Sequence, residues 1–240
     1  MKHLRNLSLV AALAVFLILA VAGCDGLKSP TAPVTQDLVP DANAEDIVNA
    51  TCSTVCKQVT LWSVDFIPMV PPGTWAASQN SGQAAAFMAA NYKRGNWYTS
   101  RPAEIIQQMS YENAWLADHY GNQFRNNNGY FTTPAQLLAM LKGHWKETGA
   151  FSAAPATEMA IYGSLQTNRP MLVQVRKNMG ATGALVWMVV IGYRPEGCCN
   201  LPASVWVNDP TRPDGKSMWY PIAAFRASWA STGKVAIFVP

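Results

Sequence analysis

The sequence has no run of basic residues, no arginine-rich helix, no glycine-rich nucleotide-binding motif and no internal repeat. Charged residues are also sparse, at 13% of the chain, and 18 Lys and Arg against 14 Asp and Glu leave a net charge of only +4. A nucleic-acid-binding surface needs clustered positive charge, so these absences argue against nucleic acid as a partner. No motif in the sequence indicates a cofactor, and we expect none.

Histidine is scarce as well, with three residues in the chain, of which His3 belongs to the charged N-terminal start. The other two, His119 and His144, sit beside glycines at the ends of predicted helices. A positively charged side chain is favourable at a helix C-terminus. We therefore interpret both as exposed or cap-proximal side chains, and a serine nucleophile served by one of them stays an alternative.

The first 23 residues have the pattern of a secretory signal. Lys2 and Arg5 form a positive start, residues 7–21 form an apolar run, and the run ends in Val21-Ala22-Gly23-Cys24. The apolar run is too short and stops too abruptly to span a membrane convincingly. A cysteine directly after small residues resembles the bacterial lipobox, which implies that Cys24 is lipidated and becomes the mature N-terminus.

Residues 24–44 contain several prolines and lack any hydrophobic period. Such a segment is typical of a tether, so we expect a lipidated N-terminus and flexible linker over 24–44. The remaining residues, 45–240, suit one domain with its own core. We expect the protein in the bacterial cell envelope, extracytoplasmic and attached to the membrane through Cys24, with the leaflet left open.

Four cysteines remain besides the lipidated one, and an even number in an exported chain favours disulfides. Residues 44–59 have a helical pattern, which puts Cys52 and Cys56 one turn apart, with Cβ atoms roughly 5–6 Å from each other. A disulfide prefers about 3.8 Å. We therefore predict that both bond across to Cys198 and Cys199. Adjacent cysteines suit a zinc tetrahedron poorly, so zinc is the less favoured alternative and we expect no metal site.

The stretch Trp75–Gly95 predicts a helix that other elements cover on all sides. Apolar and small residues occupy every face of this helix from Ala84 to Ala90. Asn80 or Ser81 would cap it, and its N-terminus would present free backbone N–H groups and a positive dipole end. Many enzymes hold a nucleophile or an anion at such a point, and the residue offered here is Ser81.

Helical patterns precede strand patterns in the rest of the chain. Residues 185–191 show no alternation, so they should form a central strand buried on both faces. Such segregation predicts an α+β fold in which an antiparallel sheet packs on the buried helix. The predicted helices are 100–121, 133–143 and 157–166, and the predicted strands are 171–176, 185–193, 203–207, 217–220 and 234–239.

Four short motifs follow one another in an order that resembles that of a known family. They are Ser81-Gly82-Gln83-Ala84, Asn168-Arg169-Pro170, the strand from Val186 to Gly192-Tyr193, and Asn208-Asp209-Pro210. Together they resemble the nucleophile helix, a strand start, the histidine strand and the Asp-Pro motif of the papain-like cysteine peptidases, especially the bacterial double-glycine leader peptidases. The resemblance covers roughly residues 65–229. It implies a papain-like fold, with an N-terminal helical part whose buried central helix packs on a C-terminal antiparallel sheet.

Catalysis in that family needs a thiolate at the helix N-terminus, a histidine to take its proton, and an Asp or Asn to orient the ring. Here the thiol position holds Ser81 and the histidine position holds Val186, which cannot move a proton. The orienting acid is kept as Asp209, although an Asn-Asp-Pro at a strand end is also a good turn. The oxyanion glutamine position falls near Trp75, with Gln79 as a displaced candidate. The resemblance thus implies a peptidase fold with no intact catalytic set.

We therefore expect a membrane-anchored lipoprotein that has lost catalysis and binds a peptide or protein in the inherited cleft. Two alternatives stay open. One is an active peptidase or hydrolase that uses Ser81 or an unrecognised dyad, and the other is a structural envelope lipoprotein without a cleft ligand. The candidate binding residues are Trp75, Gln79, Ser81, Trp97 and Trp219.

Overall fold

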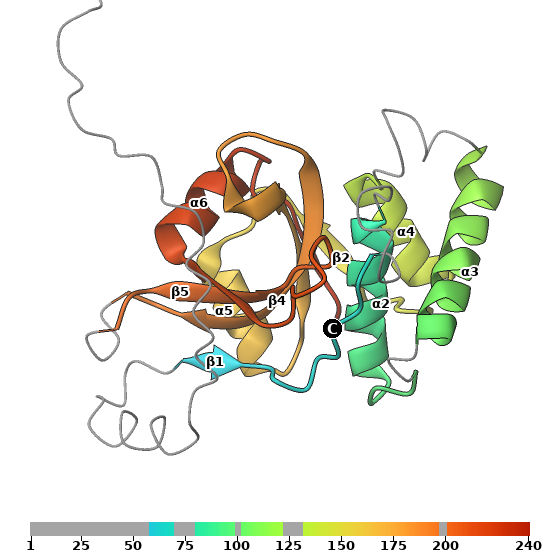
Figure 1. Cartoon of the computed structure of the whole chain (residues 1–240), viewed down its shortest axis with the longest axis horizontal. Coiled ribbons are helices and arrows are strands. Elements are labelled where there is room, and N and C mark those ends of the chain that lie inside the picture. Colours follow the sequence, from blue (N-terminus) through green and yellow to red (C-terminus); the bar gives the residue numbers. More distant parts are fainter. Residues whose placement is uncertain (1–57, 70–79, 99–101, 122–131, 197–200) are drawn as a thin grey trace, which may run out of the picture. The chain divides into compact units, whose positions relative to one another are not determined.

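The computed structural model describes residues 58–69, 80–98, 102–121, 132–196 and 201–240 (Figure 1). All of them belong to the unit Gln36–Pro240. The predicted boundaries at residues 23, 44 and 45 lie outside the described residues and stay predictions. Among the helices in the described ranges, none is both long enough and apolar enough to cross a membrane.

The described strands form one antiparallel sheet in the order β2-β7-β3-β4-β5-β6, and β1 pairs with the end of β4. The register is well defined: Leu172 of β3 lies opposite Val189 of β4 on one side and Ile237 of β7 on the other. The longest strand, β4, occupies the middle of the sheet and is buried except at its ends. The strands are β1 Val59–Thr60, β2 Phe151–Ala153, β3 Met171–Arg176, β4 Leu185–Arg194, β5 Ser204–Asn208, β6 Met218–Pro221 and β7 Ala236–Phe238.

Helix α2, Ser81–Lys93, is the buried helix of the fold, and each of its residues from Ser81 to Asn91 is buried. It packs on β3 and β4 of the sheet, while α3 (Pro102–Tyr120) and α4 (Pro134–Gly143) cover its other sides (Figure 1). A helix without a polar face can be stable only when it is covered in this way. The prediction of an all-round covered helix is therefore confirmed.

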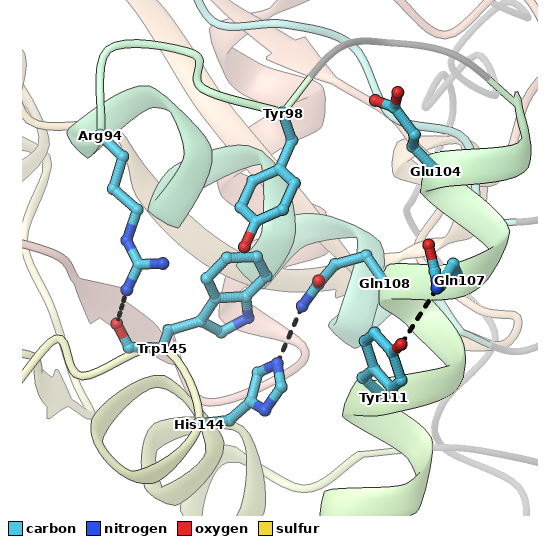
Figure 2. Close-up of a pocket in the computed structure, with 8 residues that line it drawn as sticks. All are labelled: Arg94, Tyr98, Glu104, Gln107, Gln108, Tyr111, His144 and Trp145. Carbon is cyan, nitrogen blue, oxygen red and sulfur yellow. Dashed lines mark hydrogen bonds between the residues drawn. The ribbon is translucent and has the colours of Figure 1, made fainter.

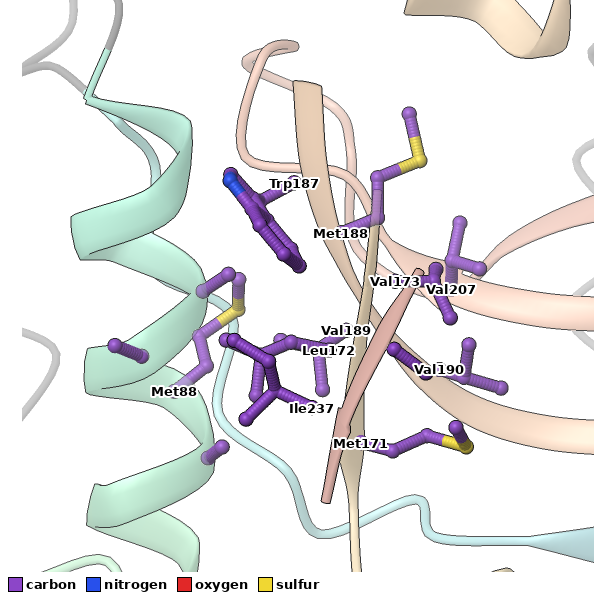
Figure 3. Close-up of a cluster of buried hydrophobic side chains, with 14 of the residues drawn as sticks. Met88, Met171, Leu172, Val173, Trp187, Met188, Val189, Val190, Val207 and Ile237 are labelled. Atoms are coloured by element: carbon purple, nitrogen blue, oxygen red, sulfur yellow. The ribbon is translucent and has the colours of Figure 1, made fainter. Parts of the chain in front are cut away.

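Strand alternation divides the hydrophobic core into two layers, as Figure 3 shows. Leu172, Trp187, Val189 and Ile237 lie on the side of the sheet that faces Met88 of α2. The second layer lies on the opposite face of the sheet and consists of Met171, Val173, Met188, Val190 and Val207.

Two further helices, α5 (Glu158–Gln166) and α6 (Ile222–Ala230), also pack on the sheet. Helix α5 contacts β1, β3 and β4, and α6 contacts β3, β5 and β6 (Figure 1). The side chain of Thr157 accepts a hydrogen bond from the backbone of Ala160 and so caps α5. The short 3-10 helix η2, Lys177–Met179, follows β3 and contacts α6.

The predicted α+β fold, with an antiparallel sheet on a buried helix, is confirmed. The predicted helices 100–121, 133–143 and 157–166 correspond to α3, α4 and α5, and the five predicted strands correspond to β3 through β7. The helical pattern over 44–59 lies outside the described residues except at its end, where it is wrong, because Val59 belongs to β1. Helix α3 is a single helix through Tyr120. Four observed elements, β1, β2, η2 and α6, were not predicted.

Candidate functional site

Ser81 is the first residue of α2 and lies against the central strand. Its hydroxyl oxygen accepts a hydrogen bond from the backbone nitrogen of Trp187, at 3.1 Å. Trp187 directly follows Val186, so Ser81 bonds to the backbone beside the histidine position of the resemblance, while the side chain of Val186 itself lies on the opposite face of β4. Only 5% of Ser81 is exposed. The preceding Asn80 occupies the N-cap position but makes no capping hydrogen bond with its side chain.

Trp187 covers the first turn of α2 with its indole ring. The ring nitrogen Nε1 donates a hydrogen bond to the carbonyl oxygen of Thr132 at 2.9 Å, and the side chain is fully buried. A Cβ atom on Gly82 would lie 3.1 Å from Cβ of Thr132 and 3.2 Å from Cδ1 of Trp187. A side chain at position 82 would therefore require Thr132 or Trp187 to shift by a few tenths of an ångström.

Gln83 joins three helices at this end of α2. Its side-chain oxygen accepts a hydrogen bond from the hydroxyl of Thr132 at 2.9 Å, and its amide nitrogen donates to Asn113 of α3 at 2.8 Å. The residue after Thr132, Thr133, begins α4 with a reciprocal capping box to Gln136. Sequence reasoning placed Gln83 only in the first helical turn, and no local pattern indicates its partners, which lie 30 and 49 residues away.

Val186 and Asp209 occupy the two remaining catalytic positions of the resemblance. Alternation along β4 places Val186 on the same face as Met188, opposite to Trp187. Asp209 follows β5 and is fully buried, and its Oδ1 accepts hydrogen bonds from the backbone nitrogen and the hydroxyl of Thr211, at 2.9 and 2.7 Å. The carboxylate thus stabilises a local turn, which is the alternative that the sequence offered for it.

The second carboxylate oxygen of Asp209, Oδ2, is buried and has no partner among the described residues. Burial raises the pKa of Asp209 above its usual value, although the hydrogen bonds from Thr211 partly oppose this. The hydroxyl of Tyr220, also buried and without a partner in the described part of the chain, has a raised pKa, first because of burial and then because of the charge on Asp209. Sequence reasoning did not single out Tyr220.

Neither described histidine is bonded to Ser81. His119 lies in the last turn of α3, is exposed, and places its Nδ1 2.8 Å from the carbonyl oxygen of Trp115. His144 is the C-cap of α4, about 15 Å along that helix from the end that contacts Gln83. Its Nε2 lies 2.8 Å from the side-chain nitrogen of Gln108. Both positions agree with the cap-proximal interpretation.

The candidate binding residues do not gather in one groove. Trp97 follows the C-terminus of α2, and the helix separates it from Ser81 by roughly 18 Å. Trp219 of β6 lies opposite Trp206, which pairs with Gly192 of β4, so it is roughly 16 Å along the strand direction from the Ser81 contact at Trp187. The structure therefore separates residues that the sequence analysis assigned to one cleft.

Several predicted site residues lie outside the described residues. They are Cys24, Cys52, Cys56, Trp75, Gln79, Cys198 and Cys199. The lipidation site, the disulfides and the oxyanion position therefore stay predictions. Two cavities of about 470 Å³ each are lined by described residues, and Ser81 lines neither of them.

A buried helix packed on the central strand of an antiparallel sheet, with its N-terminal residue touching that strand, defines a papain-like α+β protein. The chain belongs to the Peptidase_C39 like family, whose model matches residues 70–237. A crystal structure described as a C39-like peptidase from Bacillus anthracis is similar to it, with 18% sequence identity and a TM-score of 0.48, over 77% of this chain and 98% of that chain. No curated protein matches the sequence. The match to the family model confirms the predicted family.

Proposed function

We propose that this protein is a lipid-anchored, extracytoplasmic member of the family that has lost catalysis and binds a peptide or protein. The observation that supports the loss of catalysis is the contact of Ser81 with the backbone nitrogen of Trp187. A serine becomes a nucleophile when a neighbouring base takes its proton. Here the hydroxyl oxygen faces a backbone donor, which cannot accept a proton, and the neighbouring family position holds Val186.

Access to the serine also argues against turnover. Ser81 and Gln83 are buried, and the fully buried indole of Trp187 packs on the turn that follows the serine. A substrate carbonyl must come within about 3.5 Å of a nucleophile for reaction. The described side chains around the serine form hydrogen bonds with one another and so link α2, the start of α4 and β4.

Exposed tryptophans support a binding role. Trp97 is 79% exposed and Trp62 is 47% exposed. Asn96, which precedes Trp97, donates a side-chain hydrogen bond to the carbonyl oxygen of Ser63, which follows Trp62, at 2.7 Å. The two tryptophans therefore lie in adjacent parts of the surface. Exposed aromatic side chains of this size are enriched at protein interfaces and are often dominant contacts there.

The anchor rests on the sequence pattern around Cys24. A lipidated cysteine carries acyl chains and holds a protein at the membrane, with an affinity that grows with each buried methylene. We expect full-length protein to fractionate with membranes and its mature N-terminal peptide to carry lipid in mass spectrometry. Cys24→Ala should abolish both signals. A soluble wild-type protein with an unmodified Cys24 would contradict the anchor.

Peptidase assays test the catalytic part of the proposal. Full-length protein is incubated with casein and with a mixture of short peptides, beside Ser81→Ala and Ser81→Cys. We expect no hydrolysis from any of the three, because a thiol at position 81 still lacks a histidine. Hydrolysis by the wild type that disappears in Ser81→Ala would instead establish an active serine hydrolase.

Affinity capture tests the binding part. Proteins that the full-length chain captures from solubilised envelopes are identified and purified. Each is then titrated against the wild type, Trp97→Ala and a control variant. The control, Phe151→Ala, removes an exposed aromatic side chain from edge strand β2. We expect Trp97→Ala to raise the Kd by roughly tenfold or more, the range of an interface hot spot. Equal affinity of all three proteins would remove this surface from the proposal.

A further inference from the structure

One of the two cavities lies at the opposite end of α2 from Ser81. Its volume is about 470 Å³, within the range of small-molecule sites. Three elements contribute to it: the C-terminus of α2, the first half of α3 and the C-terminus of α4. Figure 2 shows the lining side chains pointing toward a common space. They are Arg94, Tyr98, Glu104, Gln107, Gln108, Tyr111, His144 and Trp145.

The back wall of this cavity is rigid. Trp145 is fully buried and stacks on Phe87 of α2, with ring centroids 5.3 Å apart. Its indole nitrogen donates a hydrogen bond to the buried carboxyl of Glu112 at 2.6 Å. Tyr98 contacts the same indole edge-on, and its backbone nitrogen donates a hydrogen bond to the side-chain oxygen Oδ1 of Asn91 at 2.9 Å. A ligand would meet this wall in a fixed position.

The polar side chains of the cavity are also held in place, yet keep unused groups. Arg94 donates to the backbone carbonyl of Trp145 and lies over its ring, 5.1 Å from the centroid. The amide nitrogen of Gln107 lies 3.0 Å from the hydroxyl of Tyr111, and that of Gln108 lies 2.8 Å from His144. The side-chain oxygens of both glutamines and the hydroxyl of Tyr98 make no hydrogen bond with described residues.

The charge of the cavity is balanced. Its lining includes one guanidinium, Arg94, which also forms an ion pair with Glu147 at 3.9 Å, and one carboxyl, Glu104. Burial, followed by the positive charges of Arg94 and Lys146, lowers the pKa of His144, so its ring is neutral at neutral pH. A strongly charged ligand would therefore find no net opposite charge. The remaining polar groups, amides and phenols, both donate and accept hydrogen bonds.

We propose that this cavity binds a saccharide. A saccharide carries several hydroxyl groups, each of which both donates and accepts hydrogen bonds. Together they can bond to the amide oxygens of Gln107 and Gln108 and to the phenol of Tyr98. The apolar face of a sugar ring can lie on the exposed ring of Tyr111, at the rim. The inference is independent of the proposed peptide-binding surface, because neither Trp62 nor Trp97 lines the cavity.

A glycan array tests the proposal on full-length protein in detergent. The array carries neutral and acidic saccharides, and a panel of uncharged tripeptides serves as the competing ligand class. The strongest saccharide is then titrated by calorimetry. We expect at least one saccharide to bind at millimolar concentration or below. If no saccharide binds, or if only tripeptides bind, the proposal is overturned.

Variants on the exposed surface of α3 locate the binding. Gln107→Leu removes an unused acceptor, and Tyr111→Ala removes the ring at the rim; both residues are exposed, so the fold should tolerate the changes. Each variant should raise the Kd roughly three- to tenfold, which is the effect of losing one hydrogen bond or one ring contact. Ile106→Ala, which alters a neighbouring exposed residue that does not line the cavity, should change the Kd by less than roughly threefold. Equal loss in all three variants, or in none, would overturn the assignment.

Discussion

The hydroxyl oxygen of Ser81 and the backbone nitrogen of Trp187 lie 3.1 Å apart and join the first turn of α2 to the central strand. Both residues are buried, so water cannot replace either partner at this point. A buried N–H group that loses its acceptor costs about 1–3 kcal/mol. At the position that the sequence resemblance assigns to a nucleophile, this chain has a buried hydrogen bond between α2 and β4.

Ser81→Ala should therefore lower the free energy of unfolding by about 1–3 kcal/mol, because it leaves the Trp187 nitrogen unpaired. Urea denaturation measures the loss. Ser110→Ala is the matched control, since Ser110 is exposed on α3 and its hydroxyl bonds only to Ile106 of its own helix. The control should stay within about 0.5 kcal/mol of wild type. Equal stability of Ser81→Ala and wild type would show that the contact is not a structural joint.

Two helical glycines should respond to alanine with opposite signs. At Gly82, a Cβ would come within 3.1 and 3.2 Å of Thr132 and Trp187, which cannot easily move because they are buried and bonded to each other. We expect Gly82→Ala to destabilise the protein by about 1 kcal/mol or more. At Gly163 in α5, a Cβ meets nothing within 4 Å, so Gly163→Ala should stabilise by about 0.5–1 kcal/mol. Thermal unfolding of both variants checks the signs, and a stabilised Gly82→Ala would contradict the close packing.

The elements that the sequence predicts well are those with long local patterns. Helix α2 was predictable because apolar residues occupy all its faces, and β4 because its apolar run has no alternation. Strands β1 and β2 have only two and three residues, too few for any period to show. Helix α6 follows β6 directly, and its N-cap, Pro221, makes no side-chain capping bond, so no start signal marks it.

The site was predictable only in part, for a related reason. The order of four motifs assigned Ser81 and Val186 to two catalytic positions of the family; Ser81 contacts the backbone of the next residue, Trp187, and the side chain of Val186 lies on the other face of β4. The network of Gln83, Thr132 and Trp187 joins residues 49 and 55 positions apart, and no local pattern encodes such contacts. The strand pattern did place Trp187 in the core, where it is fully buried, and Trp97 is exposed as its choice as a binding residue requires.

Glu112 should make stability depend on pH. Its carboxyl is fully buried in α3, and burial raises its pKa well above the usual value of 4.5, while the hydrogen bond from Trp145 partly opposes this. The folded state therefore holds the proton more tightly than the unfolded state, so stability falls as pH rises above about 4.5. Glu112→Gln keeps an oxygen acceptor for Trp145 and removes the titrating group.

We therefore expect Glu112→Gln to be more stable than wild type at mildly alkaline pH, with the difference shrinking toward acidic pH. Urea denaturation across this range measures the difference directly. Asp118→Asn, which changes an exposed carboxyl on the same helix, serves as the control and should give no such trend. A wild type that gains stability relative to Glu112→Gln as pH rises would show that Glu112 is ionised and paired in the folded protein.

The pair of Arg226 and Glu158 should have the opposite pH dependence. The guanidinium of α6 donates to both carboxylate oxygens of Glu158 on α5, at 2.6 and 2.8 Å, and Tyr193 of β4 donates to the same carboxylate at 2.6 Å. Chiefly because of the Arg226 hydrogen bonds, the pKa of Glu158 lies below its usual 4.5. The stabilisation is therefore complete above this value and is lost as pH falls through the lowered pKa.

Arg226→Met keeps the apolar stem of the side chain and removes its charge. Because 42% of the arginine side chain is exposed, solvent screens the pair, and we expect a loss of only about 0.5–1 kcal/mol at neutral pH and low salt. The loss should shrink at high salt and at a pH where Glu158 is protonated, and the exposed ion pair of Arg226 with Glu196 accounts for any remainder. Arg169→Met, an exposed arginine with no ion pair among the described residues, should show neither dependence. A loss that stays constant across salt and pH would mean that Arg226 acts through packing of its stem alone.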